Sequence, residues 1–224
     1  MAHYAVDERH ALAETLRSAR PDGRTLCGDW TVAQLTAHLV LRERSVTELL
    51  GRLPSRRLHQ LAQREIDDLV AREPYQDLVD AVEAGPSAAD ARWPVPTALV
   101  WSLPVVRERA NLLEYLVHHE DVRRAGSEWE PRLLPADLQR VVWKRLPGLT
   151  LLTMRAVPMG VALAWPGHGE VRTLRARLRG AQVRVSGDPV ELALFAFGRQ
   201  AVARVEYDGD EQQVARLLGA RIGL

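Results

Sequence analysis

The sequence predicts a chain in two parts, with helices in residues 1–150 and a small α+β fold in residues 151–224. Two patterns support this prediction. In the first part, apolar residues recur every three or four positions over long segments, as they do on one face of a helix. In the second part, short apolar runs alternate with glycine- and proline-containing turns and with short helical segments, which is typical of a small mixed domain.

Composition narrows the class of protein. The 224 residues are 46% hydrophobic, which is enough for a sizeable core. The formal net charge is +1, so the sequence gives no reason to expect nucleic-acid binding. Cys27 is the single cysteine, which excludes an intrachain disulfide and fits a reducing cytoplasm. The sequence shows neither a leader pattern nor an apolar run long enough to span a membrane, so we expect a soluble cytoplasmic protein.

Helical segments can be assigned along the first part. Val6 to Arg20 has a helical period and ends at a Pro-Asp-Gly turn. Thr31 and Gln34 form a capping box that starts a second helix, expected to reach Leu50 and to turn Arg42 toward solvent. Further helices are predicted at Leu58–Ala71, at Tyr75–Val82 and, after a proline-rich linker over Ala84–Pro96, from Pro104 in the first turn to about Ala125.

The second part is expected to contain a hairpin, two more strands and two helices. A helix from Ala136 to Arg145 connects the parts. The remaining elements are predicted as strands at Val161–Trp165, Val171–Leu178, Ala181–Ser186 and Val202–Tyr207, and helices at Asp188–Phe197 and Asp210–Leu218. Arginines 175, 177 and 179 would then line one face of the second strand, as either a solvated face or an anion-binding surface.

The stretch from Asn111 to Val122 contains the strongest functional signal. Glu114 and His118 lie four residues apart, so a helix places both side chains on one face. Burying a charged glutamate costs several kcal/mol unless it is paired or bound to a metal. His38, on the apolar side of another predicted helix, is the best additional ligand. The three residues would hold a divalent metal and leave a coordination position open.

Simpler interpretations remain for each of these residues. His38 could be a hydrogen-bonded core histidine, and Glu114 could form a salt bridge with an arginine of a neighbouring helix. The helical wheel points His119 and Glu120 away from His118, so both are expected to be more exposed. Asp121 returns to the inner face, where it could accept a hydrogen bond from a ligand histidine, or equally pair with an arginine or with the N-terminal arm.

Other candidate residues show weaker signals. Cys27 has no base that can be identified beside it, so we interpret it as a packing residue. The remaining histidines have no inward-facing partner at ligand spacing and are predicted to lie on the surface: His3, His10, His59 and His168.

Three motifs resemble a known family. They are W-T-V-A-Q-L-T-A-H-L from Trp30, E-Y-L-V-H-H-E-D from Glu114, and V-S-G-D-P-V-E-L-A-L-F-A-F-G-R from Val185. Together they resemble the mycothiol-dependent maleylpyruvate isomerase group of the DinB/YfiT-like metal-binding superfamily, an actinobacterial type. The resemblance covers most of the chain and implies a DinB-like four-helix bundle followed by a small C-terminal domain.

The resemblance also implies a site and a chemistry. His38, Glu114 and His118 would be the metal ligands, with zinc the usual metal, and mycothiol would be the thiol cofactor. Arg199 lies where related domains offer an arginine for a substrate carboxylate, although an arginine that binds the last carbonyls of its own helix is an equal alternative.

The expected function is that of a metal- and thiol-dependent isomerase or S-transferase acting on a small electrophile. The alternative is a non-catalytic protein that binds a metal or small ligand. We expect a small-molecule substrate and a thiol as partners, no nucleic acid or membrane, and a monomer or dimer.

Overall fold

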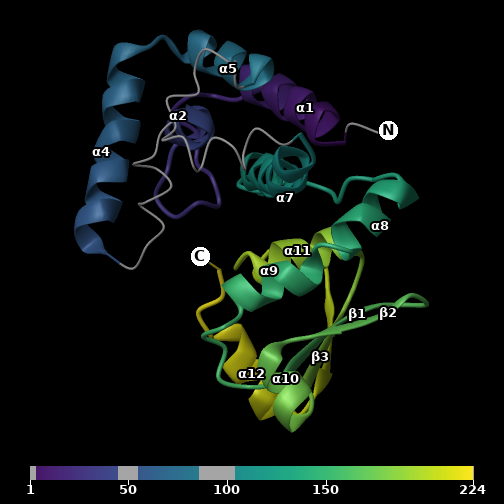
Figure 1. Ribbon diagram of the computed structural model, residues 1–224. Coiled ribbons are helices and arrows are strands. Elements are labelled where there is room, and N and C mark those ends of the chain that lie inside the picture. The colour runs from purple at the N-terminus through teal and green to yellow at the C-terminus, as the bar shows by residue number, and fades with distance from the viewer. Residues whose placement is uncertain (1–3, 45–54, 86–103, 224) are drawn as a thin grey trace. The chain divides into compact units, whose positions relative to one another are not determined.

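The computed structural model describes residues 4–44, 55–85 and 104–223 and divides into two compact units (Figure 1). The first unit is Met1–Trp129 and the second is Glu130–Leu224. The predicted boundary at residue 150 falls inside the second unit, because one helix that precedes it and one that spans it both pack against a helix that follows it. These are α8 (Ala136–Trp143) and α9 (Leu146–Thr153), which both contact α11 (Pro189–Ala196).

The first unit is helical where it is described, as predicted. Its helices are α1 (Tyr4–Ser18), α2 (Val32–Arg44), α4 (Arg56–Arg72), α5 (Tyr75–Ala84) and α7 (Pro104–Arg123). Residues 45–50 of the second predicted helix and most of the predicted linker lie outside the described residues. The helical character of this part is confirmed, whereas its assignment as a four-helix bundle stays a prediction.

Local signals fix where these helices begin and end. The predicted capping box is present at the start of α2, because the Thr31 backbone N–H donates to Gln34 Oε1 at 3.0 Å and the Gln34 N–H donates to Thr31 Oγ1 at 3.3 Å. Between α4 and α5, Glu73 is extended, as the proline that follows it requires. The sequence therefore determines these boundaries.

The core of the first unit forms where α1 packs against α7 and α5, and where α2 packs against α4 and α5. Leu12 and Leu16 of α1 and Leu112 and Leu116 of α7 are fully buried. These residues recur at intervals of four, so each helix presents a continuous apolar stripe. The polar residues that share the buried faces of α2 and α7 are therefore held within a close-packed core.

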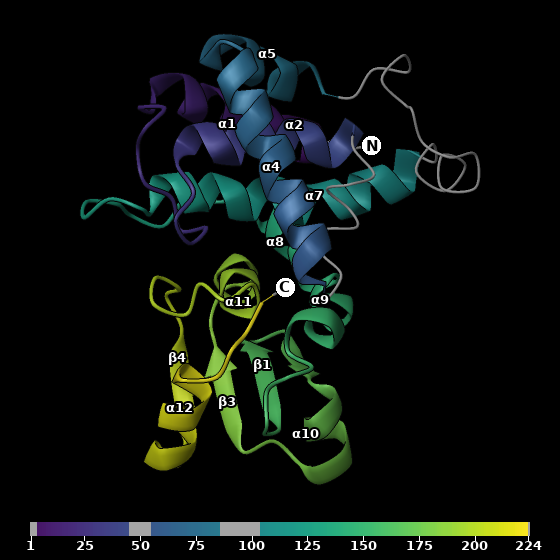
Figure 2. The same ribbon diagram turned by 90° about the vertical axis from the view of Figure 1, so that its left-hand side faces the viewer.

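The second unit contains a four-stranded mixed sheet in the order β2-β1-β3-β4, of which Figure 2 labels β1, β3 and β4. The predicted hairpin is confirmed, because β1 (Val161–Trp165) pairs antiparallel with β2 (Gly169–Arg172). β1 is also parallel to β3 (Val183–Ser186), and β3 is antiparallel to β4 (Glu206–Gly209). This confirms the small α+β character of the second part.

The predicted strand at Val171–Leu178 is wrong beyond Arg172. Residues Leu174–Arg179 form helix α10, which contacts β1 and β2. The segment consists of leucine, arginine and alanine, which are good helix formers, and Gly180 ends it with a φ of 84°. A parallel pair such as β1 and β3 cannot be joined by a tight turn, and α10 lies in the connection. The three arginines therefore do not line a strand face.

The last elements are close to prediction. Helix α11 matches its predicted range, but the final strand begins at Glu206 rather than Val202, because residues 199–202 continue in turns after α11. Asp210 caps α12 (Glu211–Leu218) by accepting from the N–H groups of Gln212 and Gln213. Among the described helices, no segment is long and apolar enough to cross a membrane.

Candidate metal centre

The three predicted ligands converge in the first unit. His38 comes from α2, and Glu114 and His118 come from α7. One ligand atom from each residue lies within 4.8 Å of the others. His118 Nε2 is 3.5 Å from Glu114 Oε2, and the two imidazole rings are edge to face with centroids 5.2 Å apart. All three side chains are largely buried.

These separations fit a tetrahedral divalent metal. Ligand nitrogen and oxygen atoms at about 2.0–2.1 Å from zinc lie roughly 3.3 Å from one another. The 3.5 Å between Glu114 and His118 is close to that value. Two imidazoles and one carboxylate are also a donor set that zinc uses in catalytic sites. The donor set and the Glu114–His118 separation therefore fit a metal, and the His38 donor atom lies within 4.8 Å of both.

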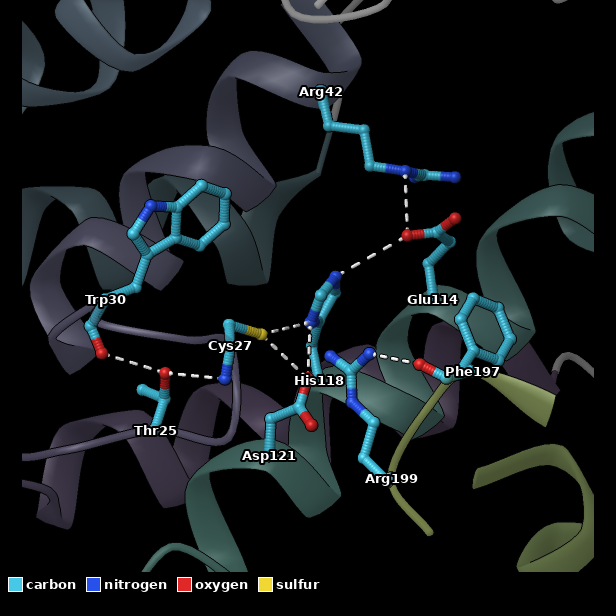
Figure 3. A network of polar contacts seen from close by, with 9 residues as sticks. All are labelled: Thr25, Cys27, Trp30, Arg42, Glu114, His118, Asp121, Phe197 and Arg199. Carbon is cyan, nitrogen blue, oxygen red and sulfur yellow. Dashed lines mark hydrogen bonds and ion pairs between the residues drawn. The ribbon is translucent and has the colours of Figure 1, made fainter. Parts of the chain in front are cut away.

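Asp121 supports His118 from the other side of the imidazole ring (Figure 3). His118 Nδ1 lies 2.9 Å from Asp121 Oδ2, and Asp121 is fully buried. Because an ionised carboxylate can only accept, we assign the hydrogen to Nδ1, which directs the Nε2 lone pair toward Glu114. This is the arrangement in which a carboxylate orients a metal-binding histidine.

The surroundings of His118 also favour its protonated form in the absence of a metal. Burial opposes the charge and lowers the pKa of His118. The Cys27 sulfur and the hydrogen bonds to Asp121, Cys27 and Glu114 act in the opposite direction. Together these interactions raise the pKa of His118 well above its ordinary value. A metal at Nε2 must therefore compete with a tightly held proton.

Arg42 is a part of the site that the sequence analysis missed. It was expected near solvent, but its side chain is only 10% exposed and its Nε lies 3.5 Å from Glu114 Oε2. Its Nη1 also donates to Asn111 Oδ1 at 2.8 Å. Arg42 follows His38 by four residues, so one face of α2 carries both side chains, and this spacing was a signal available in the sequence. The salt bridge considered as the alternative for Glu114 is thus present beside the histidine contact.

Cys27 is not the isolated packing residue that we expected. Its Sγ donates to Asp121 Oδ2 at 2.9 Å and lies 3.5 Å from His118 Nδ1. The loop that carries it is braced by Thr25, whose hydroxyl accepts from the Cys27 N–H and donates to the Trp30 carbonyl (Figure 3). His118 lies 91 positions from Cys27 in the sequence, so no local pattern could reveal this contact.

The predicted exposure of His119 and Glu120 is wrong. His119 is 4% and Glu120 1% exposed. His119 contacts Glu8 of α1. Glu120 forms ion pairs with Arg123, the last residue of α7, and with Arg124, which follows it. The helical wheel placed both side chains correctly away from His118, but α7 is covered on more than one face, so pointing away from the site does not mean pointing to solvent.

The other predicted site residues are placed as follows. Arg199, in the second unit, donates from Nη1 to the Phe197 carbonyl at 2.6 Å, which is the helix C-terminal interaction considered in the sequence analysis. His10, His59 and His168 are exposed, as predicted. His3 lies outside the described residues.

Comparisons with known proteins identify the family of the chain. The family model of the mycothiol maleylpyruvate isomerase N-terminal domain matches residues 3–123. A crystal structure of the mycothiol-dependent maleylpyruvate isomerase, in a histidine-to-alanine mutant form, has a TM-score of 0.58 and 15% identity over 92% of this chain and 90% of that chain, which shows a shared fold. No curated protein matches the sequence. The chain, matched over more than half of its length by the family model, belongs to the family of the mycothiol maleylpyruvate isomerase N-terminal domain.

Proposed function

We propose that this protein is a metal-dependent enzyme that uses a mycothiol-type thiol to isomerise, or to transfer the thiol to, a small electrophilic substrate. The observation that carries the proposal is the convergence of His38, Glu114 and His118 on one buried point in a chain that belongs to a mycothiol isomerase family. Zinc is the metal that this donor set favours.

The protein residues would hold the ion and leave one position for a thiol. A bound divalent ion would lower the pKa of a coordinated thiol from about 8.5 and make it a thiolate at neutral pH. Such a thiol would supply a nucleophile for a conjugated double bond. Reversible addition would allow rotation about that bond and give an isomer, whereas an adduct that is protonated and retained would be a transfer product.

Two residues next to the ligands would position them. Asp121 would hold the His118 ring with Nε2 directed at the metal position, because it accepts from Nδ1. Arg42 would restrain the Glu114 carboxylate and keep its charge balanced when the site is empty. In the second unit, Arg199 is the candidate for holding a substrate carboxylate, because a guanidinium binds a carboxylate through two parallel hydrogen bonds.

A binding protein without catalytic activity is the second candidate. The observation that favours it is the Arg42–Glu114 contact, which gives the buried carboxylate an ordinary charge partner. A protein could keep this pair and the three ligands after losing its reaction. Metal content alone does not separate the two candidates, because both retain the ligands.

Turnover with a thiol distinguishes the enzyme from the non-catalytic binding protein. The purified protein would be loaded with zinc and incubated with mycothiol and a panel of conjugated electrophiles, beginning with maleylpyruvate, the substrate named for the solved relative. An isomer formed without net thiol consumption indicates an isomerase, and an adduct indicates a transferase. Stoichiometric zinc binding with neither product would support the binding protein. Absence of metal uptake would contradict both candidates.

The cellular setting remains as predicted from the sequence. We propose a cytoplasmic protein whose partners are a small-molecule substrate and a thiol, with no nucleic-acid or membrane partner.

A further inference from the structure

A second group of metal-ligating side chains lies on the opposite edge of the His118 ring. Cys27 Sγ, His118 Nδ1 and Asp121 Oδ2 lie within 4.8 Å of one another, and they come from a loop and from α7. Their separations are 2.9 Å between sulfur and oxygen, 2.9 Å between nitrogen and oxygen, and 3.5 Å between sulfur and nitrogen. We propose that these three residues form a second metal site, for a thiophilic divalent ion, that shares His118 with the first.

The donor geometry fits such an ion. With a metal–sulfur distance of about 2.3 Å and metal–nitrogen and metal–oxygen distances of about 2.0 Å, tetrahedral ligands lie roughly 3.5 Å apart when one is sulfur and roughly 3.3 Å apart otherwise. The sulfur–nitrogen separation already has this value. The Asp121 oxygen has to move outward by several tenths of an ångström, which a small rotation of the carboxylate provides.

In the metal-free protein, the hydrogens of the Cys27 thiol and of His118 Nδ1 lie where the proposed ion would bind. The Cys27 thiol and His118 Nδ1 both donate to the same oxygen, Asp121 Oδ2, so two hydrogens point at one acceptor. A divalent ion that replaces them bonds to sulfur, nitrogen and oxygen and releases two protons to solvent. The cluster loses two positive charges as protons and gains two as the ion, so its net charge does not change. The negative charges of the Cys27 and Asp121 side chains are thus balanced by the ion.

The loop that carries Cys27 is fixed opposite α7 before any ion binds. The Leu26 N–H donates to the Asp121 carbonyl at 3.1 Å, which ties the loop backbone to the helix at the ligand itself. Arg24 and Thr31 form an antiparallel bridge across the base of the loop, and Gly28 provides the positive φ of 60° at its turn. Little conformational freedom therefore has to be lost when the sulfur becomes a ligand.

The chemical class of the ion follows from the sulfur. Thiolate ligands select Zn²⁺, Co²⁺ or Cd²⁺, whereas Mg²⁺ and Ca²⁺ prefer sites built from oxygen atoms. His118 would bridge two ions through its two ring nitrogens, one on the side of Glu114 and one on the side of Cys27. The second site needs the same imidazole as the proposed enzyme site, but it does not depend on the proposed reaction.

Cobalt binding to the complete, chelator-treated chain tests this proposal, because a thiolate bound to Co²⁺ gives a charge-transfer band in the near ultraviolet. Cys27 is the single cysteine, so any such band comes from this residue. The wild type should bind about two Co²⁺ per chain and show the band, and a large excess of Mg²⁺ should not remove it. Cys27→Ser should lose the band and retain about one Co²⁺, with an unchanged circular dichroism spectrum as evidence of folding.

Glu114→Gln is the matched variant. It weakens the ligand group that Glu114 forms with His38 and His118, and it leaves Cys27, His118 and Asp121 unchanged. It should keep the band and lose one of the two ions. If the wild type binds about one Co²⁺ without the band, the second site does not exist and Cys27 serves as a hydrogen-bond donor only. One Co²⁺ with the band, retained in Glu114→Gln, would instead support the second site and contradict the ligand set proposed for the enzyme.

Discussion

His119 Nδ1 lies 2.8 Å from Glu8 Oε1, and both side chains are only 5% exposed. The other ring nitrogen, Nε2, lies 2.7 Å from Thr15 Oγ1, so the imidazole joins two residues of α1 to α7. This contact faces away from His118, as the helical wheel predicts. It means that His119 holds two helices together and cannot serve as a neutral surface control for the metal ligands.

We predict that His119→Ala destabilises the protein by about 3 kcal/mol, because it removes the imidazole that contacts the buried Glu8 carboxylate and opens a cavity. Chemical unfolding of the metal-free protein measures this change. The double variant Glu8→Leu/His119→Leu should recover part of the loss, since it removes the carboxylate and the imidazole together and fills their space with apolar side chains. If His119→Ala alone unfolds as the wild type does, the contact contributes nothing to stability.

The second prediction concerns the metal ligands. His118→Ala removes the imidazole that belongs to both ligand groups, so metal content after dialysis against zinc should fall to a small fraction of the wild-type value. Elemental analysis measures it. His59→Ala is the control, because His59 is an exposed histidine of α4 and its loss should leave metal content unchanged. Equal losses in the two variants would show that zinc binds to surface histidines.

The third prediction concerns Asp121. Asp121→Asn keeps the size of the side chain but removes the negative charge that accepts from His118 Nδ1 and Cys27 Sγ. The affinity of the site formed by His38, Glu114 and His118 for zinc should fall about 10- to 100-fold. A competition titration with a chromophoric chelator measures the dissociation constant. An unchanged value would mean that the ring is oriented by its packing alone.

The fourth prediction is a pH dependence of the metal-free protein. The raised pKa of His118 means that the folded state holds its proton more tightly than the unfolded state does. The stability from this proton is fully present below about pH 6.5, the ordinary pKa, and is lost as pH rises through the raised folded pKa. Unfolding free energies of the wild type and His118→Gln, measured across this range, should converge as pH rises. A constant difference would contradict the shift.

The fifth prediction tests Arg199 as a carboxylate-binding residue. Lysine keeps the charge but loses the two-pronged guanidinium, so Arg199→Lys should raise the KM for a carboxylate-bearing electrophile about tenfold. An uncharged electrophile should be turned over as before, and metal content should not change. If both substrates are affected equally and the melting temperature falls, the bond from Arg199 to the Phe197 carbonyl is its main role.

The sequence by itself determined the helices and the ligand face of α7. The capping box at Thr31, the proline after Glu73 and the i, i+4 spacing of Glu114 and His118 act within a few residues, so local rules predict them. The same holds for Asp210 at the start of α12. The alternation in Val171–Leu178 was local too, but leucine and arginine suit both a short helix and a strand, and the parallel pairing of β1 with β3 decided in favour of the helix.

The tertiary structure alone decided what surrounds the ligands. Cys27 and Asp121 are 94 positions apart, and Glu8 and His119 are 111 apart, so their contacts depend on how α1 and the Cys27 loop pack against α7. Helical periodicity states which direction a side chain points but not which element covers it. For that reason Arg42, His119 and Glu120 were expected to be exposed, although packing buries His119 and Glu120 and leaves only 10% of the Arg42 side chain exposed.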